Sequence, residues 1–261
     1  MQLKPITINI NEYPEQFEYI LNGSKIYDSS SSPDAKVIYI QKHNGYFLKI
    51  AAKNALQKEY LMTKYYSSLG LTCNIISYIS SNRDYLLTEK INGNDCIFEK
   101  YLENPKKLCN TIAELLAQLH SINAKDCPIP NHSQNYLNTA ISNYKNGKYD
   151  KTQFPDSFGY KSEKEALQVI DKYQHLLKDD TLIHGDYCLP NIILNNWKFS
   201  GFIDLGNGGI GDKHVDIFWG LWTLYYNLKT FDFTERFMQA YGKDKIDFDT
   251  LRLIAAIATF G

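Results

Sequence analysis

The stretch that decides the fold reads His184-Gly185-Asp186-Tyr187-Cys188-Leu189-Pro190-Asn191. Leu182 and Ile183 predict a short strand before it, and Ile192-Ile193-Leu194 predicts a second strand after it. Asn195-Asn196-Trp197 then predicts a turn that leads the chain back to Asp204. Such a hairpin would bring Asp186, Asn191 and Asp204 to one end of a small β unit.

Two carboxylates and an amide oxygen are hard oxygen ligands of the kind that Mg²⁺ prefers. An ion bound there would bridge phosphate oxygens and neutralise charge during phosphoryl transfer. The spacing H-G-D-x-x-x-x-N also repeats the H-R-D-x-x-x-x-N catalytic loop of protein kinases, and Asp204 stands where kinases keep the Asp of D-F-G. The alternative is that Asp186 only caps a turn and Asp204 only ends a strand.

The rest of the chain changes from strand-like to helical patterns. Short β-branched and aromatic runs predict strands, and an Asn44-Gly45 hairpin turn joins two of them. The strands are expected at residues 25–27, 36–41, 46–50, 75–79 and 84–88, with a helix over residues 51–69. From Pro105 onward, apolar residues recur at helical spacing. We therefore expect an α+β fold, with a β-rich lobe over residues 1–90 and a helical lobe over residues 91–261.

Lys49 and Glu59 are expected to form an ion pair in the first lobe. Lys49 lies inside the apolar run Tyr46–Ile50, where an unpaired ammonium would be unfavourable. Glu59 lies on an otherwise apolar helix face and also requires a partner of opposite charge. The pair corresponds to the strand lysine and helix glutamate of kinases. The alternative is an edge-strand lysine with its charged head in water.

The catalytic stretch resembles the aminoglycoside phosphotransferases, most closely the 3′-phosphotransferase (kanamycin kinase) type. The residues that carry the resemblance are His184-Gly185-Asp186 with Asn191, then 201–206, then Gly211-Asp212-Lys213 with Asp216-Ile217. The similarity extends, more weakly, from about Tyr39 to the C-terminus. It implies a bilobal, protein-kinase-like fold that binds ATP, or GTP as the alternative nucleotide, together with Mg²⁺.

The resemblance also implies roles for individual residues. Asp186 would be the catalytic aspartate, and Asn191 and Asp204 would bind the metal. His184 and Asp216 would support the catalytic loop. Independently of the family, Asp216 precedes Ile217-Phe218-Trp219 and is expected to be the N-cap of a helix.

Two further segments would contact the nucleotide. Residues 29–34 occupy the position of the loop over the phosphates, where Ser30 and Ser31 can offer hydroxyl and backbone N–H groups. This loop lacks G-x-G-x-x-G, and an ordinary surface loop is the alternative. Glu89 and Ile91 lie in a connector that fits an adenine-binding hinge, whose contacts would come from the backbone.

Composition excludes several classes of protein. The formal net charge is −1, which removes any global electrostatic argument for binding nucleic acid or membranes. The 5 cysteines are odd in number and lack C-x-x-C spacing, which disfavours a disulfide framework or a zinc knuckle. With neither a signal sequence nor a long apolar run, we expect a soluble, cytoplasmic protein, as a monomer or weak dimer.

The expected activity is the ATP- and Mg²⁺-dependent phosphorylation of an aminoglycoside hydroxyl, which would confer antibiotic resistance. The alternatives are a kinase of another small alcohol, such as an amino alcohol or a peptide antibiotic, and a non-catalytic kinase-like binding protein. The acceptor side departs from the family, because Asn207 replaces a common Arg and the chain end is not acidic. Residues 143–161 also contain Lys145, Lys148, Lys151 and Lys161. The carboxylates expected to offset this charge are Asp150, Asp156, Asp212, Asp232 and Glu235.

Overall fold

The computed structural model describes residues 3–150 and 159–261, which form two compact units. The N-terminal unit contains the described residues up to Asp95 together with Ile192–Gly206, and the C-terminal unit contains the others. The sequence predicted a single boundary between the lobes at residue 90. The structure differs from this prediction because the hairpin at residues 192–206 belongs to the N-terminal unit. The hairpin joins the N-terminal unit because β9 (Ile192–Asn195) pairs with both β7 (Asn94–Asp95) and β10 (Lys198–Phe202).

The N-terminal unit is built on a six-stranded antiparallel sheet in the order β1-β2-β3-β4-β6-β5. The expected strands are all present. The six strands are β1 (Lys4–Ile6), β2 (Lys25–Asp28), β3 (Ala35–Gln41), β4 (Tyr46–Ala52), β5 (Ile75–Ser80) and β6 (Arg83–Glu89).

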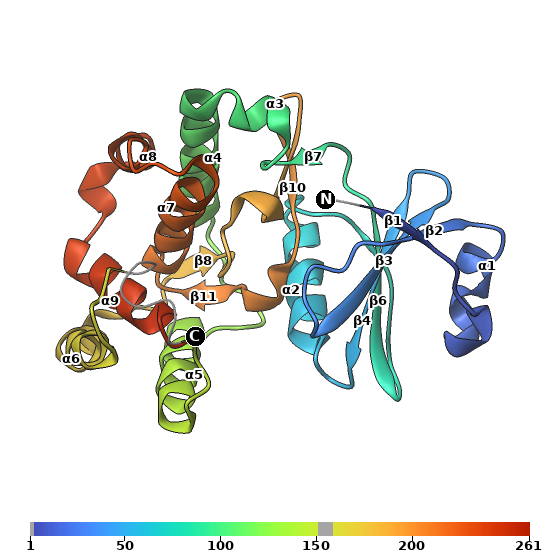
Figure 1. The fold of residues 1–261 in the computed structure, drawn as a ribbon, viewed down its shortest axis with the longest axis horizontal. Coiled ribbons are helices and arrows are strands. Elements are labelled where there is room, and N and C mark those ends of the chain that lie inside the picture. Colours follow the sequence, from blue (N-terminus) through green and yellow to red (C-terminus); the bar gives the residue numbers. More distant parts are fainter. Residues whose placement is uncertain (1–2, 151–158) are drawn as a thin grey trace. The chain divides into compact units, whose positions relative to one another are not determined.

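The two faces of this sheet are covered by different helices. The chain segment that includes α1 (Glu18–Leu21) packs on one face against Leu48 and Ile50, and α2 (Gln57–Ser68) lies on the other face. Figure 1 shows α1 and α2 on opposite sides of the sheet. Side chains alternate between the faces of a strand, so Lys49 points toward α2.

The helix expected to start at residue 51 begins later. Ala51 and Ala52 continue β4, and α2 starts at Gln57. The buried carboxylate of Asp84 accepts a hydrogen bond from the Leu56 backbone N–H at 2.9 Å and so holds the chain at the helix start. Ala51 remains part of the sheet because it pairs in register with Asp84 of β6.

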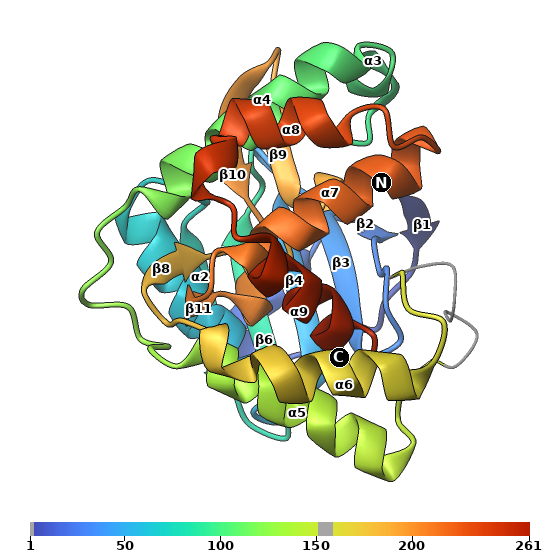
Figure 2. The same cartoon turned by 90° about the vertical axis from the view of Figure 1, so that its left-hand side faces the viewer.

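The C-terminal unit is mainly helical, as expected. Its core joins α5, α6, α7 and α9, and α4 packs along α8, as Figure 2 shows. The helices are α3 (Glu99–Leu102), α4 (Pro105–His120), α5 (His132–Asn146), α6 (Glu163–Tyr173), α7 (His214–Leu228), α8 (Thr234–Tyr241) and α9 (Phe248–Ala258). The strands β8 (Thr181–Ile183) and β11 (Gly209–Gly211) form a small antiparallel pair. None of the helices in the described ranges has the length and apolar character needed to span a membrane.

Candidate active site

The loop after β8 requires glycine between His184 and Asp186. Gly185 has a φ of 80°, in the left-handed region that disfavours other residues. A Cβ atom at this position would also lie 2.0 Å from the backbone oxygen of Asn207. The sequence His-Gly-Asp therefore reflects both the turn and the close approach of a second chain segment.

Asp216 holds this loop from α7. Its two carboxylate oxygens accept hydrogen bonds from the backbone N–H groups of His184 and Gly185, each at 2.7 Å. The side chain is fully buried. The sequence predicted that Asp216 would be the N-cap of this helix. This prediction is wrong, because α7 already begins at His214. The carboxylate serves the loop instead of the end of its own helix.

Sequence reasoning missed two residues that extend this network. His120, at the end of α4, contacts Asp216 through Nε2 at 3.2 Å and the Tyr241 hydroxyl through Nδ1 at 2.9 Å. In the tautomer that carries the proton on Nε2, His120 donates to the Asp216 carboxylate. Three helices thus fix the carboxylate that holds the loop. The signal was weak, because a histidine at a helix C-terminus is explained equally well by the helix dipole.

Asp186 and Asn191 lie near the two ends of the candidate catalytic loop, residues 184–191, and contact each other. Asn191 donates from Nδ2 to the Asp186 carboxylate at 2.9 Å and to the Asp186 backbone oxygen at 3.0 Å. The loop is further fixed by the Leu189 N–H, which donates to the Thr223 hydroxyl at 3.1 Å. Because the amide nitrogen makes both contacts, the amide oxygen of Asn191 accepts none of these hydrogen bonds.

The N-terminal unit contains a charged cluster around Lys49. The expected ion pair with Glu59 is present, with Nζ and Oε2 separated by 2.7 Å. Lys49 Nζ also lies 2.7 Å from Asp204 Oδ1, a contact that the sequence did not suggest. Glu59 and Lys49 are largely buried, whereas the Asp204 side chain is 48% exposed. Asp204 is thus the member of this cluster that is open to a ligand.

The pKa values in this cluster reflect a competition between burial and charge. Burial disfavours the Lys49 ammonium, but the two carboxylates outweigh it, so the pKa of Lys49 lies above its ordinary value. Burial raises the pKa of Glu59, Lys49 acts to lower it, and Asp204 adds to the rise. Lys49 is therefore held as a cation, ready to contact an anion.

A pH experiment tests the cation assigned to Lys49. The pKa of Lys49 is higher in the folded protein than in the unfolded chain. The ion pairing therefore stabilises the folded state fully at pH values below the unfolded-state pKa. This stabilisation is lost as the pH rises through the folded-state pKa. Glu59→Gln removes one of the two carboxylates, so the pKa of Lys49 should fall. Nucleotide affinity measured calorimetrically should then begin to decline at a lower pH than in the parent. Coincident pH profiles for the two proteins would contradict this role of Glu59.

Asp204 adopts a backbone conformation that few residues other than glycine adopt. Its φ is 59°, in the left-handed region. The strand before Asp204 is fixed by a neighbouring chain segment. The Phe202 N–H donates to the Leu71 oxygen, and the Phe202 oxygen accepts from the Thr72 hydroxyl. Backbone conformations of this kind cluster at functional sites. Here it places the carboxylate beside Lys49.

Asp204 and Asn191 offer oxygen atoms of the kind that Mg²⁺ binds. Among the residues that the structure describes, no three His, Cys, Asp or Glu side chains converge on a preformed metal position. Asp204 has one carboxylate oxygen beyond its contact with Lys49, and Asn191 has its amide oxygen. These are hard oxygen donors, as Mg²⁺ requires, and the ion keeps several other positions for water and phosphate. Each of these two residues therefore has the donor chemistry that this metal requires.

The residues expected at the nucleotide also lie in the N-terminal unit. The Ser30 hydroxyl donates to Asp28 at 2.7 Å and accepts from the Val37 N–H at 2.9 Å, whereas Ser31 is exposed. The Glu89 carboxylate accepts a hydrogen bond from the Asn74 amide at 3.0 Å. In the hinge, the backbone N–H of Ile91 donates no hydrogen bond to the described residues.

Two of the carboxylates expected to attract a cationic acceptor are already engaged. Asp212 is buried and accepts from the His214 ring and from the Lys178 N–H, so it is a structural residue. Glu235 pairs with Lys243 at 2.9 Å. Asp232 is exposed, as is Asp150, which has contacts of its own. Asp156 and Lys151 lie outside the described residues.

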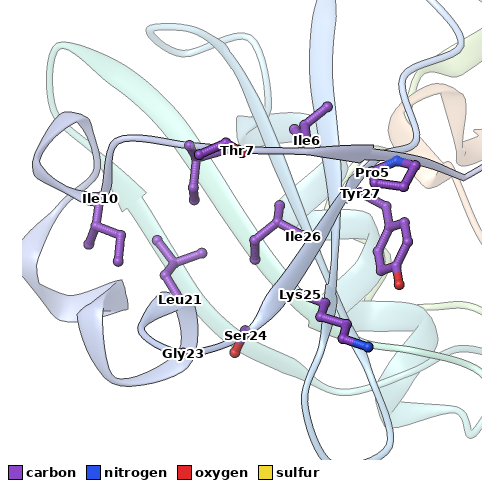
Figure 3. A pocket seen from close by; sticks show the side chains of 11 residues that line it. Pro5, Ile6, Thr7, Ile10, Leu21, Gly23, Ser24, Lys25, Ile26 and Tyr27 are labelled. Carbon is purple, nitrogen blue, oxygen red and sulfur yellow. The ribbon is translucent and has the colours of Figure 1, made fainter.

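A pocket of about 340 Å³ elsewhere in the N-terminal unit is distinct from the candidate active site. Figure 3 shows it between β1, β2 and the turn after α1, with Ile10, Leu21 and Ile26 around the space. Lys25 is the one charged residue of its described lining. The pocket contains none of the residues of the Lys49 cluster or the catalytic loop.

The fold and these two groups of residues define a phosphotransferase of the kinase-like type. A model of the phosphotransferase enzyme family (APH) matches residues 30–254. A probable aminoglycoside 3′-phosphotransferase of Lactococcus lactis is 47% identical over 265 residues, which span 99% of each protein. An aminoglycoside 3′-phosphotransferase of Niallia circulans is 29% identical over 177 residues, covering 68% of this chain and 67% of that protein.

Solved structures agree on the fold. The aminoglycoside-3′-phosphotransferase of type VIII superposes with a TM-score of 0.78 at 19% identity, over 96% of each chain. A Streptomyces rimosus aminoglycoside phosphotransferase in complex with ADP and streptomycin gives a TM-score of 0.75 at 18% identity, over 97% of this chain and 99% of that one. The chain therefore belongs to the phosphotransferase enzyme family and is an aminoglycoside 3′-phosphotransferase-like kinase. The predicted family, enzyme class and fold are confirmed.

Proposed function

We propose that this enzyme transfers the γ-phosphate of ATP to a hydroxyl group of an aminoglycoside and so confers resistance to that antibiotic. The observation that carries the proposal is the rigid loop around Asp186, held by Asp216 through two short hydrogen bonds. The relative from Lactococcus lactis, which matches nearly the whole chain, supports the choice of acceptor. An amino alcohol or a peptide antibiotic is the alternative acceptor.

Asp186 orients the attacking hydroxyl and accepts its proton. A general base must lie within hydrogen-bond reach of the proton that it takes, and its own position must be fixed. Asn191 supplies that restraint, because its amide donates to the Asp186 carboxylate at 2.9 Å. The second oxygen of Asp186 is then available to the acceptor. The reaction forms a bond from the acceptor oxygen to the γ-phosphorus and breaks the bond from that phosphorus to the ADP oxygen.

Lys49 binds the phosphates of the nucleotide, and Glu59 keeps the ammonium in place from α2. Asn191 and Asp204 would hold Mg²⁺, which supplies positive charge to the phosphate oxygens when bound. We assign Ser30 and Ser31 to the phosphate loop, and the backbone of Glu89 and Ile91 to the nucleobase. Backbone contacts of this kind can bind the base of ATP, and GTP is the alternative nucleotide.

A turnover screen tests the proposed acceptor. ATP consumption should rise on addition of kanamycin or neomycin, and expression in a sensitive bacterium should raise its resistance. The screen should include amino alcohols and peptide antibiotics under the same conditions. Stimulation by one of these compounds, and by none of the aminoglycosides, would leave the kinase chemistry in place and overturn the acceptor.

A further inference from the structure

Two polar side chains behind Asp216 have no part in the chemistry proposed above. His120 ends α4 and Tyr241 ends α8, and their rings meet edge to face with centroids 5.7 Å apart. Both side chains are largely buried. Burial of a polar group is unfavourable unless the group is hydrogen-bonded, so the position of each ring is set by its partners. These two residues are called the support pair below.

The support pair forms a chain of hydrogen bonds that leads to the catalytic loop. The Tyr241 hydroxyl lies 2.9 Å from His120 Nδ1, and His120 Nε2 lies 3.2 Å from Asp216 Oδ2. Asp216 in turn accepts from the backbone N–H groups of His184 and Gly185. In the tautomer that carries the proton on Nε2, His120 donates to Asp216 and its Nδ1 accepts from Tyr241.

The buried carboxylate of Asp216 gains its third hydrogen-bond partner from His120. A carboxylate that is removed from water requires hydrogen bonds to replace its hydration. Two of the partners are backbone N–H groups of the loop, and His120 supplies a contact from outside the loop. Oδ2 contacts both the His184 N–H and His120, so loss of His120 would weaken the support of the oxygen that holds His184.

Helix α4 also holds the loop at a second point. The Tyr187 hydroxyl donates to the backbone oxygen of Ile112 at 2.7 Å, and Tyr187 is fully buried. His120 lies eight residues further along the same helix, which corresponds to about 12 Å. Asp186 lies between Gly185, which Asp216 holds, and Tyr187. A shift at either anchor would therefore move the Asp186 carboxylate.

We propose that His120, fixed by Tyr241, is a positioning residue that sets the place of the Asp186 carboxylate through Asp216 and the loop backbone. The proposal rests on the proposed function, since it requires that Asp186 acts on the acceptor hydroxyl. A small misplacement of a catalytic group lowers the rate of the reaction step strongly. Because the nucleotide contacts are assigned mainly to the N-terminal unit, the effect of the support pair falls on kcat and spares the affinity for ATP.

Substitution of the support pair tests this role through kcat. His120→Leu should lower kcat for kanamycin about tenfold and leave the KM for ATP nearly unchanged. His120→Gln retains an amide donor for Asp216 and should recover most of the loss. Tyr241→Phe should lower kcat about threefold. Its matched control is Tyr160→Phe, which removes another buried hydroxyl in the same unit, one that donates to the Arg252 oxygen and should leave kcat as in the parent.

Amide hydrogen exchange of the loop provides a readout that needs no acceptor. The backbone N–H groups of His184 and Gly185 are the donors to Asp216. They should exchange faster in His120→Leu than in the parent, and His120→Gln should restore their protection. Tyr160→Phe should leave their exchange as in the parent.

Several outcomes would overturn this role of His120. One is amide exchange at His184 and Gly185 that is unchanged in His120→Leu, whatever the change in kcat. Another is an equal loss of kcat in Tyr241→Phe and Tyr160→Phe, because the effect would then be a general destabilisation of the unit. A parent that does not phosphorylate kanamycin would overturn the proposed acceptor, and amide exchange would still decide the role of the support pair. If His120→Leu does not fold, Tyr241→Phe gives the same comparison.

Discussion

Replacing Asp186 with Asn should lower kcat by about 10²-fold or more and leave the affinity for ATP nearly unchanged. The substitution keeps the size of the side chain and an oxygen that can accept from the Asn191 amide, but it removes the group that takes the proton. The loss therefore belongs to the reaction step, and steady-state kinetics combined with nucleotide titration measure it directly.

The matched control for this variant is Asp244→Asn, which neutralises an exposed carboxylate in the same unit. It should behave as the parent does. Thermal unfolding of Asp186→Asn should also resemble that of the parent, because Asp216 and Thr223 still hold the loop. Turnover at the parental rate would remove Asp186 from the catalytic role.

Replacing Asp204 with Ala should weaken the binding of Mg·ATP by about tenfold or more, because a carboxylate that bridges the protein to the metal is lost. The effect should appear in the binding constant and depend on Mg²⁺. In the absence of the metal, the nucleotide affinity of the variant should be much closer to that of the parent. Isothermal titration with and without Mg²⁺ separates the two contributions.

The control for Asp204→Ala is Glu15→Ala, which removes an exposed carboxylate from the same unit. Lys49 retains Glu59 in the Asp204 variant, so the cationic side chain stays in place. Equal Mg·ATP affinities in the variant and the parent would exclude Asp204 from the metal site.

The parts of the site that could be predicted from sequence are those set by local chemistry. A buried lysine in an apolar strand required a partner, and Glu59 on the next helix supplied it at 2.7 Å. The strands predicted on either side of His184–Asn191 implied a loop between them, and the structure adds a close approach of Gly185 to Asn207. In both cases the constraint comes from neighbouring residues or from one helix face, which a sequence displays directly.

The parts that could not be predicted depend on contacts between distant segments. His120 contacts Asp216, and Tyr241 contacts His120, only because α4, α7 and α8 pack together, and no local pattern marks these residues. Asp212 looked available to a substrate, but its side chain is buried against His214. The start of α2 was misplaced because β4 continues to Ala52, where pairing with β6 outweighs the helical preference of alanine.

The most direct test of the central claim is the identity of the phosphorylated product. Kanamycin incubated with ATP, Mg²⁺ and the enzyme should yield ADP and an equal amount of kanamycin phosphorylated on one sugar hydroxyl, as phosphorus NMR and mass spectrometry would show. The claim would be contradicted if kanamycin remained unchanged while ATP was converted to ADP and inorganic phosphate, and if an uncharged or zwitterionic alcohol became phosphorylated instead.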